Sequence, residues 1–221
     1  MIEVLGRRNS ANVQKVMWTL GELGLDYLRH DVGGSFGYPE DYPNPNQVVP
    51  SLRDGDVTVW ESNACVRYLA RTYGAQAGTE SLWPEDPAKL ALADAWMEWQ
   101  RSDISNAFFI MFQMMIRGLA GSPEKLEKLI AQSGQCFAQL DAHLADRDYI
   151  CGDALSFADI AIGAMTYRYF RLDVARPALP NMAAWQTRLE DRPAYQKHVM
   201  IEFGTNIDEW NAHEAANAGI Q

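Results

Sequence analysis

The residues best suited to chemistry lie at a predicted helix start, where Glu61 and Ser62 precede an apolar helical run that ends near Tyr73. The free N–H groups and the positive dipole end of such a helix favour an anion, and the Ser62 hydroxyl adds a further donor. Upstream, Pro50 opens a strand, and its missing N–H is tolerated only where that backbone edge faces no partner strand. An exposed backbone edge beside an anion site suits an extended, peptide-like ligand with a free carboxylate.

Short strands and one helix are expected to position this stretch. The second strand of a hairpin covers 57–60, and the Asp54-Gly55 pair before it is typical of a tight turn that needs positive φ. The preceding chain predicts a strand at 2–5, a helix with apolar residues at helical spacing over 13–23, a strand at 26–32 and, over 33–49, a long loop with one helical turn. The predicted order is therefore β-α-β-loop-β-β-α, closing at Gly74.

The chain after Gly74 loses periodicity and then becomes helical throughout. Residues 74–87 are typical of a linker, and Asp86 followed by Pro87 predicts a helix start. That helix is expected to run to about Arg117, with a polar interruption at 100–106, and another is expected from Ser122-Pro123 to about 145. A capping box at Ser156 and Asp159 predicts a further helix start, and a last helix is expected to stop near Arg192-Pro193. The tail from Glu202 onward is expected to be irregular.

The composition of the 221 residues, 48% apolar and 22% charged, is typical of a soluble globular protein with a sizeable core. We expect no membrane span, because no run of about 18 apolar residues occurs. The N-terminus lacks the basic-then-apolar order of a signal peptide. A net charge of −10 opposes nucleic-acid binding.

The cysteines and histidines predict neither a redox centre nor a metal site. Cys65, Cys136 and Cys151 form no C-x-x-C pattern and fit a reducing cytoplasm. Cys65 is expected in the core, while Cys136 and Cys151 have no basic or histidine neighbour in the sequence and are expected to be inert. The four histidines share no ligand spacing, so no metal is expected.

Several motifs together resemble those of the cytosolic glutathione transferase family. They cover about residues 2–200, and the opening run at 6–16 is similar to a bacterial branch near the theta and zeta types. In chain order they are Asn44-Pro45, Val49-Pro50-Ser51-Leu52, the Asp54-Gly55 hairpin, Trp60-Glu61-Ser62-Asn63-Ala64, Arg67-Tyr68-Leu69, Leu82-Trp83-Pro84, the box at Ser156 and Asp159, Leu179-Pro180-Asn181, Trp185 and Arg192-Pro193.

The resemblance implies a fold with two parts and a particular co-substrate. We expect a thioredoxin-like domain over 1–77, a linker over 78–87 and an all-helical domain over 88–221 that carries the substrate pocket. The expected co-substrate is glutathione, without a metal, and the expected assembly is a homodimer in the cytoplasm.

The resemblance also assigns most of a glutathione site. Pro50 matches the cis-proline whose turned peptide lets the Val49 backbone pair with the cysteinyl part of glutathione. Glu61 and Ser62 match the residues that receive the γ-glutamyl end, which agrees with the anion site indicated by the residues themselves.

The glycyl end of the ligand departs from the family pattern. Many relatives carry a basic residue just before the Val-Pro pair, but Val48 stands there, and Gln47 stands where the pattern often has Gly. The glycyl carboxylate is therefore expected to be held otherwise, by Gln47 or by one of Arg7 and Arg8.

The chemistry implied by the resemblance needs a thiolate, whereas a free thiol with a pKa near ~8.5 is only a few per cent ionised at neutral pH. Ser10 is the first candidate for a donor to the sulfur, because it lies in the loop before the first helix at the spacing of the serine-type branches. Asn12 is the alternative; it is either the N-cap of that helix or itself a donor.

The electrophile is expected to bind along the aromatic and Met-rich run at 107–115. This run is apolar all round, so part of it is core or dimer interface, and one face, including Phe108 and Phe112, lines the pocket. Arg117 either steers an anionic substrate or interacts with the helix C-terminus. The electrophile is expected to be small and hydrophobic or anionic.

The resulting hypothesis is a glutathione S-transferase, a transferase of alkyl or aryl groups. One alternative is glutathione-dependent peroxide or disulfide reduction, or dehalogenation; the absence of a cysteine at position 10 argues against the redox chemistry. The other alternative is a non-catalytic binding module with the same fold, against which the presence of Ser10, Glu61 and Ser62 argues.

Overall fold

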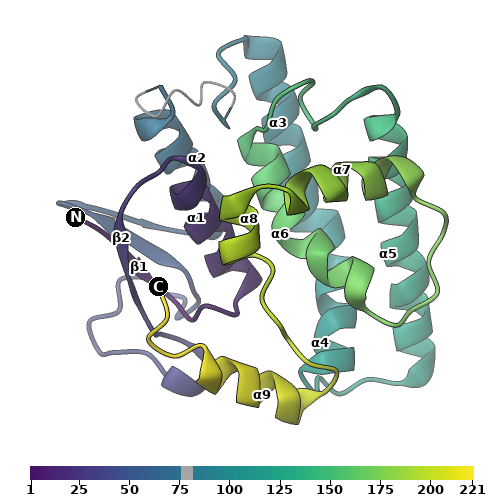
Figure 1. Cartoon of the computed structure of the whole chain (residues 1–221). Helices are drawn as coiled ribbons and strands as arrows, with labels where there is room; N and C mark the ends of the chain where they lie inside the picture. The colour runs from purple at the N-terminus through teal and green to yellow at the C-terminus, as the bar shows by residue number, and fades with distance from the viewer. Residues whose placement is uncertain (76–81) are drawn as a thin grey trace.

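The computed structural model describes residues 1–75 and 82–221, and it places a small sheet with its helices beside a larger group of helices (Figure 1). The N-terminal elements are β1 (Ile2–Leu5), α1 (Ala11–Glu22), β2 (Tyr27–His30), the 3-10 turn η1 (Gly34–Phe36), β3 (Ser51–Asp54), β4 (Val57–Trp60) and α2 (Ser62–Tyr73). The strand order is β2-β1-β3-β4, with β1 parallel to β2 and antiparallel to β3. The predicted β-α-β-loop-β-β-α order is confirmed.

The hairpin between β3 and β4 turns as its glycine predicts. The strands pair from Ser51 opposite Trp60 to Asp54 opposite Val57, so the turn itself consists of Gly55 and Asp56. Gly55 has φ 57°, a conformation that costs glycine little because it has no Cβ. The turn sets β4 in register, and α2 starts directly after it.

The described residues after the linker are mostly helical. The elements are α3 (Pro87–Trp99), a π-helix η3 (Gln100–Phe109), α4 (Ile110–Ile116), α5 (Pro123–His143), the 3-10 turn η4 (Leu144–Asp146), α6 (Phe157–Arg171), α7 (Pro180–Glu190), α8 (Pro193–His198) and α9 (Ile207–Ala216). The helix starts predicted at Asp86-Pro87 and Ser122-Pro123 are confirmed. Of the predicted linker, residues 78–81 lie outside the described residues.

The polar interruption predicted at 100–106 is a change of helix type. Residues 100–109 form a π-helix between α3 and α4, and the Ser105 hydroxyl donates to the Gln100 carbonyl at 3.1 Å. Such wide turns are rare and commonly lie near functional sites. Here the π-helix brings Gln100 against α1 and α2.

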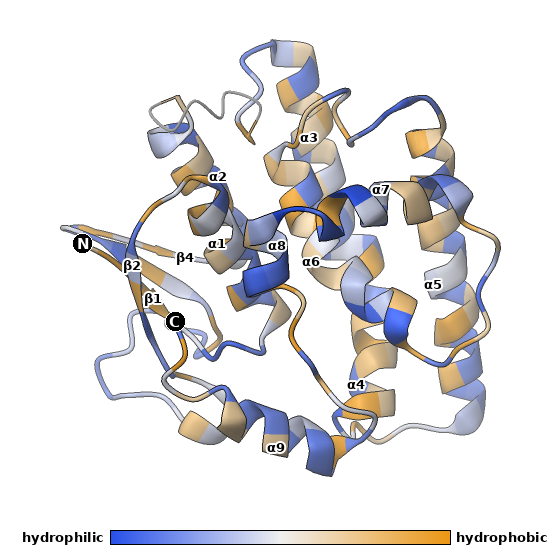
Figure 2. Cartoon of the chain, in the orientation of Figure 1, coloured by the Kyte–Doolittle hydropathy of each residue, from blue (hydrophilic) through white to orange (hydrophobic). Residues whose placement is uncertain are grey.

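The expectation for the chain after Arg192 is wrong, because two more helices follow. The six residues of α8 begin at Pro193, and α9 begins after Asn206, whose side chain accepts hydrogen bonds from the Asp208 and Glu209 N–H groups, each at 3.0 Å. The sequence of α9 mixes hydrophilic and hydrophobic residues without a continuous apolar face (Figure 2). Only Trp210 and Glu214 of this helix are buried, which is why hydrophobic periodicity does not reveal it.

Helices α1 and α6 lie at the centre of the structure and position the site. Helix α1 packs against α2, α6 and α8, and residues on every side of it are buried, including Trp18. Helix α6 is buried over almost its whole length. Its N-terminus has the predicted capping box, in which the Asp159 carboxylate accepts from the Ser156 N–H at 2.9 Å and the Ser156 hydroxyl at 2.8 Å.

Candidate functional site

The loop before β3 presents a free backbone segment. The Val49–Pro50 peptide is cis, as the resemblance implied. The Val48 carbonyl accepts from the Tyr42 hydroxyl at 2.9 Å and from the Asn44 side-chain amide at 3.0 Å, which fixes the loop. Among the described residues, none forms a hydrogen bond with the Val49 backbone, so its N–H and carbonyl remain available to an extended ligand.

Glu61 and Ser62 form the junction between β4 and α2. Glu61 is the N-cap residue and has φ 68°, which is unusual for a residue with a side chain and common at binding sites. Ser62 is the first helical residue, and its hydroxyl donates to the Asn12 side-chain oxygen at 3.2 Å. Two residues predicted to belong to one site, Asn12 and Ser62, are therefore in contact.

A cavity of about 190 Å³ lies at this junction. Its lining comes from α1, α2, the end of α3 and the π-helix, and consists of Asn12, Lys15, Glu61, Ser62, Asn63, Ala64, Arg67, Glu98, Gln100, Arg101 and Ser105. The side chains are mostly polar, and Glu61 and Ser62 form part of the wall. The cavity can take a small polar group such as an amino-acid end.

Lys15 is the residue of this cavity that sequence reasoning missed. Its side chain is 1% exposed, and its ammonium donates to Asn63 Oδ1 at 3.0 Å, Gln100 Oε1 at 2.9 Å and Ser62 Oγ at 3.5 Å. Burial lowers the pKa of the ammonium to about 7, and the Glu61 carboxylate opposes this shift. The sequence carried no signal for this position, because a single lysine in a helix is ordinarily exposed and its burial here comes from contacts with α2 and the π-helix.

Ser10 is the N-cap residue of α1, with extended backbone (φ −78°, ψ 124°), but its side chain makes no capping hydrogen bond. The hydroxyl is therefore not committed to its own helix and can donate to a ligand atom at the helix N-terminus. Asn12 is the second residue of α1, so the expectation that it could be the N-cap is wrong. Its side-chain oxygen already accepts from Ser62.

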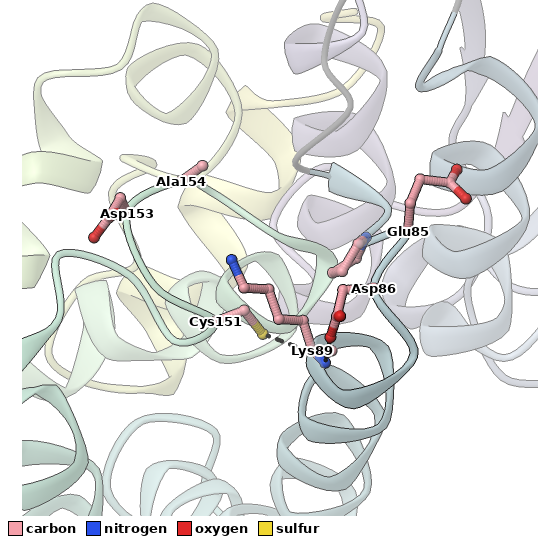
Figure 3. A pocket seen from close by; sticks show the side chains of 7 residues that line it. Glu85, Asp86, Lys89, Cys151, Asp153 and Ala154 are labelled. Atoms are coloured by element: carbon pink, nitrogen blue, oxygen red, sulfur yellow. Dashed lines mark hydrogen bonds between the residues drawn. The ribbon is translucent and has the colours of Figure 1, made fainter.

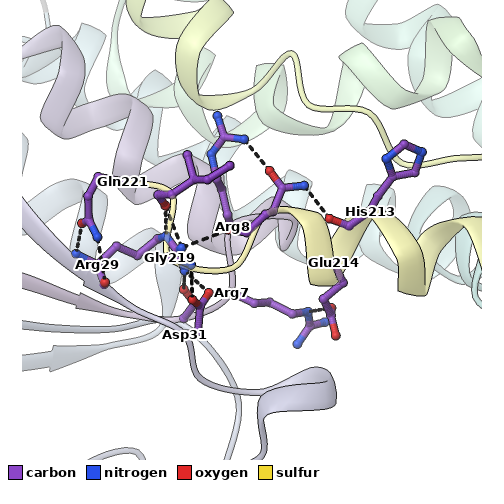
Figure 4. A network of polar contacts seen from close by, with 11 residues as sticks. Arg7, Arg8, Arg29, Asp31, His213, Glu214, Gly219 and Gln221 are labelled. Atoms are coloured by element: carbon purple, nitrogen blue, oxygen red, sulfur yellow. Dashed lines mark hydrogen bonds and ion pairs between the residues drawn. The ribbon is translucent and has the colours of Figure 1, made fainter.

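Of the three residues considered for the glycyl carboxylate, Arg7 and Arg8 already have partners in the C-terminal part of the chain. Arg7 forms an ion pair with Glu214 at 2.8 Å (Figure 4). Arg8 donates to the Asn217 side chain and to the Lys197 carbonyl. Gln47, with φ 49°, is exposed next to the 46% exposed Val48. The role of Gln47 stays a prediction.

The residues predicted for the electrophile lie in an aromatic cluster. Phe108 and Phe112 are 2% and 1% exposed, and Phe112 packs edge-on against Phe203 and Trp210. The Arg117 guanidinium lies over the Trp210 ring at 5.0 Å. Helix α9 thus covers this side of the molecule, and the substrate role of these residues stays a prediction.

A second cavity, of about 300 Å³, is lined by residues from 84–89 and 151–154, and these include Cys151 with its thiol (Figure 3). Cys151 and Lys89 both line it, so the structure gives Cys151 a basic neighbour that the sequence did not show. Burial nevertheless raises the pKa of the Cys151 thiol to about 11. It also raises the pKa of Cys65 to about 12 and that of Cys136. All three thiols stay protonated at neutral pH and are poor nucleophiles.

Within residues 1–75 and 82–221, no group of three His, Cys, Asp or Glu side chains is arranged to hold a metal ion. In the same part of the chain, every helix is too short or too polar to cross a bilayer.

Comparisons with known proteins identify the family of the chain. The family model "Glutathione S-transferase, N-terminal domain" matches residues 9–72, and "Glutathione S-transferase, C-terminal domain" matches 103–193. Glutathione S-transferase GstB of Escherichia coli is 40% identical over 91% of this chain and 99% of its own length. Glutathione S-transferase 3 of Zea mays is 32% identical over 90% of this chain and 93% of its own.

Among solved structures, the theta class glutathione S-transferase from Xanthomonas axonopodis pv. citri, with glutathione bound, superposes with a TM-score of 0.85. It is 40% identical and covers 92% of this chain and 99% of its own. The predicted fold and the predicted resemblance to a bacterial theta-like branch are confirmed. The chain belongs to the glutathione S-transferase family.

Proposed function

We propose that the protein joins the sulfur of glutathione to a small electrophile. On binding, the thiol releases its proton to solvent, and the thiolate accepts a hydrogen bond from the Ser10 hydroxyl. The thiolate then forms a bond to the electrophilic carbon, and the leaving group departs with the electron pair of the bond that breaks. No oxidant or reductant takes part.

The observation that carries the proposal is the uncommitted Ser10 hydroxyl at the N-terminus of α1. The same helix carries Asn12 and Lys15, which contact Ser62 in the polar cavity. A ligand with its γ-glutamyl end in that cavity and its cysteinyl backbone on Val49 would bring its sulfur towards the start of α1. Support for glutathione itself comes from the Xanthomonas relative, which was solved with it.

Ser10→Ala and Asn12→Ala, made separately, test the assignment of the donor. A hydrogen bond to a charged group contributes about 1.5–3 kcal/mol, so loss of the true donor should lower turnover of an activated aryl halide about 10- to 100-fold. The bound thiolate, followed by its ultraviolet absorbance at neutral pH, should fall in parallel. Unchanged turnover in both variants would refute the donor assignment.

The same titration separates the enzyme from a binding module. An enzyme develops the thiolate absorbance as glutathione saturates the site. Binding without that absorbance would support a non-catalytic binding module.

The proposal also includes the homodimer and the cytoplasmic location. Val57 and Trp60 on the edge strand β4 are 43% and 40% exposed, and they offer apolar surface to a partner.

A further inference from the structure

Arg168 of α6 forms hydrogen bonds with the N-terminal part of the chain on either side of Ser10. The side chain is buried, and its Nη2 donates to the Asn9 carbonyl at 2.7 Å and to the Gln14 side-chain oxygen at 3.1 Å. Asn9 directly precedes Ser10, and the Gln14 N–H donates to the Ser10 carbonyl at 2.8 Å. One guanidinium thus fixes the chain on both sides of Ser10.

The surroundings of Arg168 are apolar and cationic. Its guanidinium carbon lies 5.1 Å from the Phe112 ring centre and 5.7 Å from that of Trp210. No carboxylate of the described residues forms an ion pair with it. The charged groups that act on it are Arg117 and Arg7, because burial raises the pKa of the neighbouring Tyr167 and Tyr195 phenols and keeps them neutral.

The cluster of Arg7, Arg117 and Arg168 therefore holds more positive than negative charge. Glu214 also lies there, but it is paired with Arg7 at 2.8 Å and accepts from the Ser35 N–H at 2.8 Å. Burial, and then repulsion by Arg117 and Arg7, lowers the pKa of Arg168 to about 9. A buried cation without a counter-ion is costly, and an anion placed beside it recovers part of that cost.

We propose that Arg168 positions Ser10 and supplies buried positive charge that stabilises the thiolate of bound glutathione. This inference rests on the proposed function and names the anion that the cluster lacks. The thiol proton leaves to solvent as before, and Arg168 neither takes nor gives a proton. Arg168 does not touch the sulfur; it acts through its hydrogen bond to the Asn9 carbonyl and through the electrostatic field of its guanidinium. It is therefore a positioning residue.

The test measures the pKa of glutathione bound to Arg168→Gln, Arg168→Met and Arg168→Lys, by ultraviolet absorbance of the thiolate against pH. Gln keeps a donor for the Asn9 carbonyl but removes the charge; Met removes both. One charge that acts across about 12 Å of protein at an effective dielectric of about 20 predicts that Gln raises the thiol pKa by about one unit. Met should raise it at least as much, and Lys, which keeps a cation, by less than half as much.

Arg171→Gln is the matched control, because Arg171 lies on the same helix but pairs with Glu190 at 3.1 Å. It should leave the thiol pKa unchanged. Binding of S-methylglutathione, which has no ionisable thiol, shows whether the site of each variant is intact, and it should stay within about twofold of the parent protein for Gln and Lys.

The possible results separate this inference from the proposed function. If the parent protein forms the thiolate and Ser10→Ala lowers it, but no Arg168 variant raises the thiol pKa, only the role of Arg168 is overturned. Equal rises for Lys and Gln would overturn the part played by charge. Weaker S-methylglutathione binding, with an unchanged pKa of the bound glutathione thiol at saturation, would make Arg168 purely structural. A parent protein that forms no thiolate would overturn the proposed function and this inference with it.

Discussion

The buried Lys15 should make the stability of the protein depend on pH in a way that one substitution removes. Its ammonium is 1% exposed and is surrounded by neutral oxygens of Ser62, Asn63 and Gln100. Desolvation lowers its pKa from 10.5 to about 7 in the folded protein. In the unfolded chain the lysine returns to water and to its usual pKa.

The sign follows from proton binding in the two states. Below pH 7 both states hold the proton, so this residue adds no slope. Between pH 7 and 10.5 the unfolded chain binds more protons than the folded one, and the free energy of unfolding therefore rises with pH. A full proton contributes about 1.4 kcal/mol per pH unit, so the gain from pH 7 to pH 9 is about 2 kcal/mol.

Urea denaturation of the parent protein and of Lys15→Met at pH 7, 8 and 9 measures this gain. Lys15→Met cannot titrate there, and its own loss of hydrogen bonds shifts the curve at every pH alike. We expect the free energy of unfolding of the parent protein to rise by about 2 kcal/mol more than that of Lys15→Met between pH 7 and 9. Lys128→Met, at an exposed position on α5, is the control and should keep the slope of the parent protein. Equal slopes in the parent protein and Lys15→Met would refute the reasoning.

Two further predictions concern folding and ligand affinity. The buried Asp159 carboxylate accepts from the Ile150 N–H and the Trp185 indole, each at 2.9 Å, besides its two bonds to Ser156. Asp159→Ala should therefore lower the free energy of unfolding by about 3–5 kcal/mol. An unchanged urea midpoint would contradict this prediction. Val48→Lys supplies the basic residue that many relatives carry and should tighten glutathione binding by about two- to fivefold at low salt, a gain of roughly 0.5–1 kcal/mol. Val48→Glu should weaken it, and equal affinities by calorimetry for both variants would show that the glycyl carboxylate lies elsewhere.

Local signals predicted most of the elements that position the site. The hairpin glycine, the proline-led helix starts and the Ser156–Asp159 box each act within a few residues, so their chemistry can be read along the chain. The start of α9 had such a signal too, since Asn206 caps the helix. Its sparse apolar residues hid it.

The site itself was only half predictable because its polar contacts join distant segments. Ser62 is a helix-start residue in the sequence, but its contacts with Asn12 and Lys15 bridge about 50 positions, as the folded chain shows. From the sequence alone, Lys15 and Arg168 would be expected to be exposed charged residues. Their burial depends on how α1, α2 and α6 pack, and no local pattern encodes that packing.

The segment after α9 covers part of one edge of the sheet, at β2. Strand β2 is at an edge of the sheet, and such edges are templates for aggregation. The Gln221 side chain pairs with both the N–H and the carbonyl of Arg29, and the Arg29 guanidinium donates to the Ile220 carbonyl (Figure 4). Residues 217–221 therefore cover the backbone of Arg29 at this edge, and a chain shortened at Ala216 would leave that N–H and carbonyl free to pair with another chain.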